Sequence, residues 1–97
     1  MSEASRSTGA GDDALPAIDF ATFVLSLSHN ALVHLGDAPD PSGGPHRPDA
    51  AMAKQTIDLL AVLQEKTAGN LTGEEERLLD QVIYDLRMRY VEVVRTA

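Results

Sequence analysis

Residues 72–95, TGEEERLLDQVIYDLRMRYVEVVR, decide the fold of this chain. Thr72 and Glu75 form a capping box, in which each side chain accepts a hydrogen bond from the other residue's backbone N–H at the start of a helix. The glutamates at positions 74–76 also lie at the positive end of the helix dipole, which favours acidic side chains. The apolar residues that follow recur at the spacing of one helix face, and they are Leu79, Val82, Ile83, Leu86, Tyr90 and Val93. The stretch therefore predicts a helix over residues 73–95 with one buried face.

A second set of residues runs along the same predicted helix, nearly opposite its core face. We call this set the third-helix stripe, and its members are Arg77, Gln81, Tyr84, Met88, Val91 and Arg95. Tyrosine, methionine and arginine are enriched at protein interfaces. The stripe therefore predicts a helix-on-helix contact with another chain, with Tyr84 and Met88 at its middle and the two arginines at its rim. Two alternatives stay open: another helix of the same chain covers this face, or these are ordinary exposed residues.

The first predicted helix covers residues 19–35. Asp19 is a suitable N-cap, and Gly36 suits the left-handed position that follows many helices. Two apolar stripes run along this helix, about 100–140° apart on a helical wheel. The main stripe comprises Phe20, Phe23, Val24, Leu27, Ala31 and Leu35, and the second, which we call the first-helix stripe, comprises Ala21, Leu25 and Leu32. A helix that is apolar on two sides needs two neighbours, either within its own bundle or in another subunit.

The second predicted helix covers residues 50–67, with Asp49 as its N-cap. Thr56 and Gln64 fall within its apolar arc, so each needs a polar partner if it is buried. The apolar members of that arc are Met52, Ile57, Leu59, Leu60 and Leu63. The connector before this helix, residues 37–48, contains four of the five prolines and predicts irregular structure, because proline lacks a backbone donor and disfavours helix in the preceding residue.

Three helices and no alternating strand pattern give the fold class. We predict an all-α domain over residues 18–97, either a small three-helix bundle or an α-hairpin with a docked N-terminal helix. Residues 1–17 form an acidic tail with too little apolar content to repay ordering, and we expect this tail to be disordered. The helical part has roughly 60 residues, a size at which a lone core is marginal and partners often help. We therefore expect the domain to assemble as a homo-oligomer.

The composition argues against several classes of function. The chain has 97 residues and a formal net charge of −7, which disfavours non-specific binding to nucleic acid. It contains no cysteine, so disulfides and thiolate sites are excluded. No signal peptide is apparent, and the most apolar stretch, residues 20–35, is shorter than the roughly 20 residues that span a bilayer. We expect a soluble cytoplasmic protein that does not bind membranes.

No residue pattern points to catalysis, a cofactor or a metal. His29 and His34 are five residues apart and diverge on a helix, unlike the i, i+4 pair that binds zinc, and His46 lies in the connector. The three glutamates that begin the last helix have dipole compensation as their ordinary role. No nucleophile–base order and no glycine-rich phosphate loop is recognisable. We therefore expect no enzyme activity and no cofactor.

Two blocks of the chain resemble a known family. The first is IDFATFVLSL followed by ALVHLG, residues 18–27 and 31–36. The second runs from AKQTID through LQEKT and GNLT to EEERLL and YDLRMRY, within residues 53–90. Together these blocks resemble a family of short bacterial proteins catalogued as a domain of unknown function, number 1844 in its series. The resemblance implies a bacterial cytosolic setting and brings no reaction, cofactor or catalytic residue.

The function that the sequence favours is protein binding, first of all to a second copy as a homodimer. The contact would bury the apolar residues left over on the first-helix stripe and the third-helix stripe. An alternative is an RNA-associated accessory protein that uses the basic end of the last helix, at Arg87, Arg89 and Arg95. Against it, Arg87 and Arg89 point to different sides, and cations are favourable at a helix C-terminus without any ligand. An unidentified cytosolic protein is the remaining candidate partner.

Overall fold

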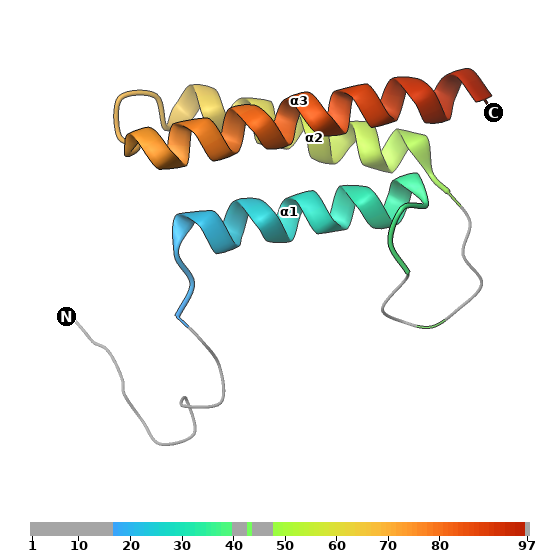
Figure 1. Cartoon of the computed structure of the whole chain (residues 1–97), viewed down its shortest axis with the longest axis horizontal. Helices are drawn as coiled ribbons and strands as arrows, with labels where there is room; N and C mark the ends of the chain where they lie inside the picture. The colour runs from blue at the N-terminus through green and yellow to red at the C-terminus, as the bar shows by residue number, and fades with distance from the viewer. Residues whose placement is uncertain (1–16, 40–42, 44–47, 97) are drawn as a thin grey trace.

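The computed structural model describes residues 17–39, 43 and 48–96. It contains three helices, α1 (Phe20–Leu35), α2 (Ala50–Lys66) and α3 (Gly73–Thr96). Successive helices run in opposite directions, so α2 is antiparallel to both α1 and α3 (Figure 1). Each helix packs against the other two, which confirms the all-α prediction and makes the fold a three-helix bundle. The predicted disordered tail, except for its last residue, and most of the predicted connector lie outside the described residues.

Capping side chains set where the helices begin. Asp19 and Asp49 each accept a hydrogen bond from the backbone N–H three residues later, at 2.8 and 3.1 Å. The predicted capping box at the start of α3 is present: Glu75 N–H donates to Thr72 Oγ1 at 3.1 Å, and Thr72 N–H donates to Glu75 Oε1 at 2.9 Å. These oxygens satisfy backbone donors that have no partner inside the helix. Because the signals are local, the observed helix bounds agree with the predicted ones to within one residue.

The two ends of the connector are tied together. Gly36 has a φ of 87°, a left-handed conformation that a residue without Cβ adopts readily. The next residue, Asp37, donates its N–H to the carbonyl of Leu32 at 2.9 Å and closes the last turn of α1. Across the connector, Asp49 N–H donates to the carbonyl of His34 at 2.7 Å. The start of α2 is therefore anchored to the end of α1.

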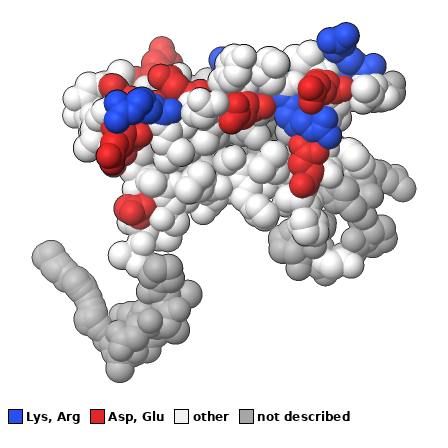
Figure 2. All heavy atoms as spheres, in the orientation of Figure 1, with Lys and Arg blue, Asp and Glu red and all other residues white. Residues whose placement is uncertain are grey.

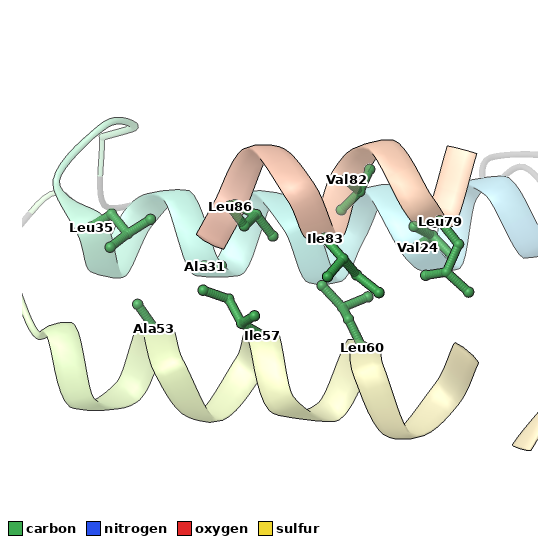
Figure 3. Close-up of a cluster of buried hydrophobic side chains, with 10 residues drawn as sticks. All are labelled: Val24, Ala31, Leu35, Ala53, Ile57, Leu60, Leu79, Val82, Ile83 and Leu86. Atoms are coloured by element: carbon green, nitrogen blue, oxygen red, sulfur yellow. The ribbon is translucent and has the colours of Figure 1, made fainter. Parts of the chain in front are cut away.

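The core lies between the three helices and consists of buried apolar side chains (Figure 3). Its members are Val24, Ala31, Leu35, Ala53, Ile57, Leu60, Leu79, Val82, Ile83 and Leu86. The predicted face of α3 is confirmed, because four of its residues are in this set and Tyr90 and Val93 pack against it. Every buried member is aliphatic, so the helices are held together by packing and not by buried polar contacts.

The predicted apolar faces of α1 and α2 are broader than the faces that the bundle buries. Phe23 and Met52 are each 43% exposed, and Leu59 is 54% exposed. These three residues were expected on core-facing arcs, and the structure corrects this. The physical reason is that a bundle of three helices covers only the side of each helix that points toward its axis.

The polar residues within the α2 arc have found partners. Thr56 is buried, and its hydroxyl donates to the carbonyl of Met52 at 3.3 Å. Gln64 is half-buried and donates its side-chain amide to the carboxylate of Asp80 on α3. The Gln64–Asp80 hydrogen bond therefore joins the two helices at the edge of the core.

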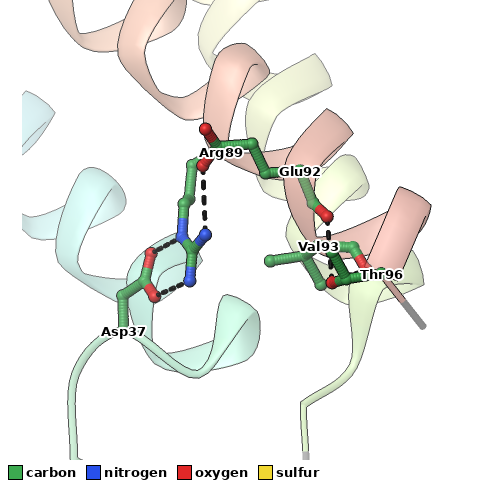
Figure 4. Close-up of polar contacts among 5 residues, drawn as sticks. All are labelled: Asp37, Arg89, Glu92, Val93 and Thr96. Atoms are coloured by element: carbon green, nitrogen blue, oxygen red, sulfur yellow. Dashed lines mark hydrogen bonds and ion pairs between the residues drawn. The ribbon is translucent and has the colours of Figure 1, made fainter.

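One ion pair links the turn after α1 to α3 (Figure 4). Arg89 donates from Nε and Nη2 to the two carboxylate oxygens of Asp37 at 2.6 and 2.7 Å, and from Nη1 to Glu92 at 3.1 Å. The hydrogen bonds from Arg89 lower the pKa of Asp37, and those bonds also raise the pKa of Arg89. The Arg89 and Asp37 side chains remain 42% and 24% exposed, so solvent screens the pair and its contribution to stability is modest.

We expect Asp37→Asn to lower the free energy of unfolding by about 0.5–1 kcal/mol at neutral pH, the upper range for exposed pairs because this one is bidentate. Folding lowers the pKa of Asp37, so the stabilisation is fully present above its usual value of 3.8. This stabilisation is lost as the pH falls through the lower pKa that Asp37 has in the folded chain. Urea unfolding followed by circular dichroism, repeated from neutral to acidic pH, measures the difference between Asp37→Asn and wild type.

Asp58→Asn is the matched control for Asp37→Asn. It breaks the Lys54–Asp58 pair, which spans 2.9 Å within one helix between side chains that are more than half exposed. We expect this variant to lower the free energy of unfolding by less than Asp37→Asn does, because solvent screens the Lys54–Asp58 pair more strongly. If both variants lost the same free energy of unfolding, the Asp37–Arg89 pair would not stabilise the packing of α1 against α3.

Adjacent leucines on α2 test the assignment of the core. Leu60 is fully buried and Leu59 is half exposed. Truncating each leucine to alanine removes the same atoms, but only at Leu60 do those atoms come from the core. We expect Leu60→Ala to lower the free energy of unfolding by about 2–5 kcal/mol, and Leu59→Ala by at most about 1 kcal/mol. Chemical unfolding at low protein concentration measures both. Equal losses would contradict the assigned packing of α2.

Candidate functional site

Several large apolar side chains lie outside the core and line two shallow grooves. The first, which we call the α1–α2 groove, is lined by Phe23, Leu27, Leu59, Val62, Leu63 and Lys66. The second, the α2–α3 groove, is lined by Gln64, Asp80, Ile83, Tyr84, Arg87, Met88 and Val91. Their volumes are about 280 and 300 Å³. Both grooves offer apolar surface to another molecule.

All six members of the third-helix stripe are exposed. Tyr84, Met88 and Val91 are 61%, 52% and 48% exposed, and they form one wall of the α2–α3 groove. The stripe lies outside because the residues on the opposite side of α3 fill the core. The alternative in which another helix of the same bundle covers this face is therefore wrong for the described part of the chain.

The bundle itself takes up most of the first-helix stripe. Leu32 packs against the core, and Ala21 is partly buried in a hollow that it shares with Leu78 of α3. Leu25, the third member, is 51% exposed. The bundle thus covers Leu32 and part of Ala21, and it leaves Leu25 at the surface. An interface role for this stripe stays a prediction, and Leu25 is its most exposed member.

Sequence reasoning missed the α1–α2 groove. Leu59 and Val62 line this groove. Both are about half exposed, because neither lies on the face of α2 that enters the core. A signal for this surface exists in the sequence, because exposed residues on α2 recur with spacings of 3, 4, 3 and 4. These residues are Met52, Gln55, Leu59, Val62 and Lys66. The same spacing identified the third-helix stripe.

Charged side chains gather on α2 and α3 and are missing from α1. The sequence of α1 contains no Lys, Arg, Asp or Glu, and Figure 2 shows an uncharged band across the molecule with the charges concentrated along α3. The first turn of α3 is acidic and its last turn carries Arg95. Between them, Asp80 and Arg87 border the α2–α3 groove. Asp80 accepts the Gln64 amide, and Arg87 has no ion-pair partner among the described residues.

The three arginines near the end of α3 do not form one basic surface. Arg89 is paired with Asp37 and Glu92, which offset its charge locally. Arg87 turns toward the α2–α3 groove, and Arg95 lies in the last turn of α3. The pairing with Asp37 and Glu92 accounts for Arg89 without any ligand.

The histidines do not converge on a site. His29 is exposed and His34 is half-buried on α1, whereas His46 lies outside the described residues. Over residues 17–39, 43 and 48–96, no group of three His, Asp or Glu side chains is arranged to hold a metal ion. In the same ranges, no helix is both long enough and apolar enough to cross a bilayer.

Residues 17–92 match the family model described as Domain of unknown function (DUF1844), and this match covers well over half of the chain. The chain belongs to this family. The resemblance found in the two sequence blocks is thereby confirmed. The match includes α1, α2 and all of α3 except its last turn, so most of the third-helix stripe lies within it. No curated protein and no solved structure matches the chain significantly.

Proposed function

We propose that this DUF1844 chain is a non-catalytic, cytoplasmic interaction module that self-associates by burying the third-helix stripe against a second copy. One observation carries the proposal: Tyr84, Met88 and Val91 follow one another along the outer side of α3, and each keeps about half of its surface exposed. Removing such a contiguous set of apolar side chains from water is favourable, and tyrosine and methionine are enriched where proteins meet. The cytoplasmic location rests on the cysteine-free composition.

The dimensions of the third-helix stripe determine the affinity that we expect for the homodimer. At a rise of 1.5 Å per residue, the stretch from Arg77 to Arg95 is about 27 Å long, and a helix with its side chains is about 10–12 Å wide. One helix of this length covers well below the roughly 800 Å² per partner that a stable protein complex buries. The homodimer should therefore form at micromolar concentration and dissociate on dilution.

A second copy suits this surface better than RNA does. The third-helix stripe is apolar at its middle, and a net charge of −7 repels polyphosphate. Arg89 is already paired with two carboxylates, which leaves Arg87 and Arg95 as the remaining basic side chains at this end. RNA binding there would weaken steadily with added salt and would be lost in an Arg87→Glu/Arg95→Glu variant.

We expect Met88→Asp to raise the dissociation constant of the homodimer at least tenfold, because it places a charge inside an apolar contact without a partner. Helicity should be unchanged, since Met88 lies outside the core. The absolute mass from light scattering, measured over a wide range of protein concentration, reports the association. Circular dichroism of the same samples reports the helicity.

Leu59→Asp is the matched control for Met88→Asp. Leu59 is 54% exposed and Met88 is 52% exposed, but Leu59 lies in the α1–α2 groove. The control should have the same mass as wild type at every concentration. Dissociation by Leu59→Asp alone would move the interface to the α1–α2 groove. A wild-type chain that stays monomeric throughout, or a Met88→Asp variant that associates as wild type does, would refute the proposal.

A further inference from the structure

We infer that the second copy docks with its α3 antiparallel to this α3, about a two-fold axis that passes close to Tyr84. The inference rests on the proposed self-association and specifies its partner surface. That surface is the third-helix stripe of the other copy, together with the side of its α3 that borders the α2–α3 groove and carries Asp80 and Arg87.

The bordering flank of α3 carries one charge of each sign. Asp80 and Arg87 both line the α2–α3 groove, with Ile83 and Tyr84 between them. They are two helical turns apart, or about 10.5 Å along the axis. A two-fold axis perpendicular to α3 and midway between them places Asp80 of each copy opposite Arg87 of the other. A parallel pair would instead bring Asp80 against Asp80 and Arg87 against Arg87, so charge complementarity selects the antiparallel arrangement.

The two ends of α3 agree with this arrangement. Its first turn carries Glu74, Glu75 and Glu76, and its last turn carries Arg95. Of these, Glu76 lies on the α2–α3 side of α3, beside Asp80. In the register that Asp80 and Arg87 set, Glu76 of each copy lies opposite Val91 of the other, which is four residues or about 6 Å along the helix from Arg95. The helix dipoles also run in opposite directions, which is the favourable orientation for neighbouring helices. The same register places Tyr84 at the axis, against Tyr84 of the other copy.

The opposite flank of α3 explains on which side the second copy lies. It carries Asp85 and Glu92, of which Asp85 accepts a hydrogen bond from Gln81 at 2.8 Å and Glu92 accepts one from Arg89 at 3.1 Å. A contact centred on this flank would bring Asp85 close to its own copy, with like charges facing each other. The second α3 is therefore displaced toward the α2–α3 groove, where Asp80 and Arg87 pair and Gln64 adds surface from α2.

Single cysteines test the direction of the contact, because the chain contains none of its own. Tyr84→Cys should form a disulfide-linked dimer under mild oxidation, since both copies of this position lie at the axis. Arg95→Cys should not link to itself, because its two copies are about 35 Å apart along the helices, whereas a disulfide requires Cα atoms within about 7 Å. A mixture of Val91→Cys with Glu76→Cys should link, because the register places these two positions opposite each other on the α2–α3 side. Glu65→Cys, on the exposed side of α2, gives the background rate.

Charge reversal provides a second readout that keeps Tyr84 in place. Asp80→Arg and Arg87→Asp should each raise the dissociation constant about tenfold, because each turns two attractive pairs into two repulsive ones. The double variant Asp80→Arg/Arg87→Asp should return to near the wild-type value. Circular dichroism checks that losing the Gln64–Asp80 hydrogen bond leaves α2 and α3 folded.

Three other results would overturn the antiparallel arrangement. Self-linking of Arg95→Cys as readily as Tyr84→Cys would show a parallel contact and overturn the inference, while the proposed self-association stood. A concentration-dependent dimer with no Tyr84→Cys link above the Glu65→Cys background, and no response to charge reversal, would place the contact elsewhere and also overturn it. A monomer at every concentration would overturn the inference and the proposed function together.

Discussion

The structure depends on the packing of aliphatic side chains that the three helices bury against one another. Each helix can turn only one side toward the bundle axis, so the core is limited to the residues on that side. Leu59 and Leu60 show the consequence, because adjacent leucines on α2 lie on the surface and in the interior. Apolar residues beyond the core-facing side have no place inside the chain. The candidate interaction surfaces are therefore a direct result of how little a bundle of this size can bury.

The sequence predicts the helices well because their signals are local. The N-caps at Asp19 and Asp49 and the capping box at Thr72 each satisfy backbone donors within a few residues, whatever the rest of the chain does. The core face of α3 is equally predictable, since a long helix with one regular apolar spacing has one orientation that buries it. Tyr84 and Met88 follow from the same spacing, and their exposure agrees with their place opposite the core.

What the sequence does not predict are the contacts between helices. A helical wheel identifies the apolar residues of α1, but it does not say that Leu32 will meet a neighbour while Phe23 stays at the surface. The Asp37–Arg89 and Gln64–Asp80 contacts join residues far apart in the chain, and residue spacing carries no information about them. Residue spacing on α2 indicates one wall of the α1–α2 groove, but the other wall comes from α1, so the groove itself depends on how these two helices pack. Such features depend on which helix lies beside which.

Long-range repulsion opposes the proposed homodimer, because each copy carries a net charge of −7. At physiological ionic strength the Debye length is about 8 Å, so charges far from the contact are largely screened and the contact itself decides the balance. There, the acidic start and basic end of α3 stabilise the isolated helix through its dipole. The same order along α3 makes an antiparallel copy complementary and a parallel copy repulsive. An arrangement of charges that first serves the helix thus also gives direction to an apolar contact, which by itself has none.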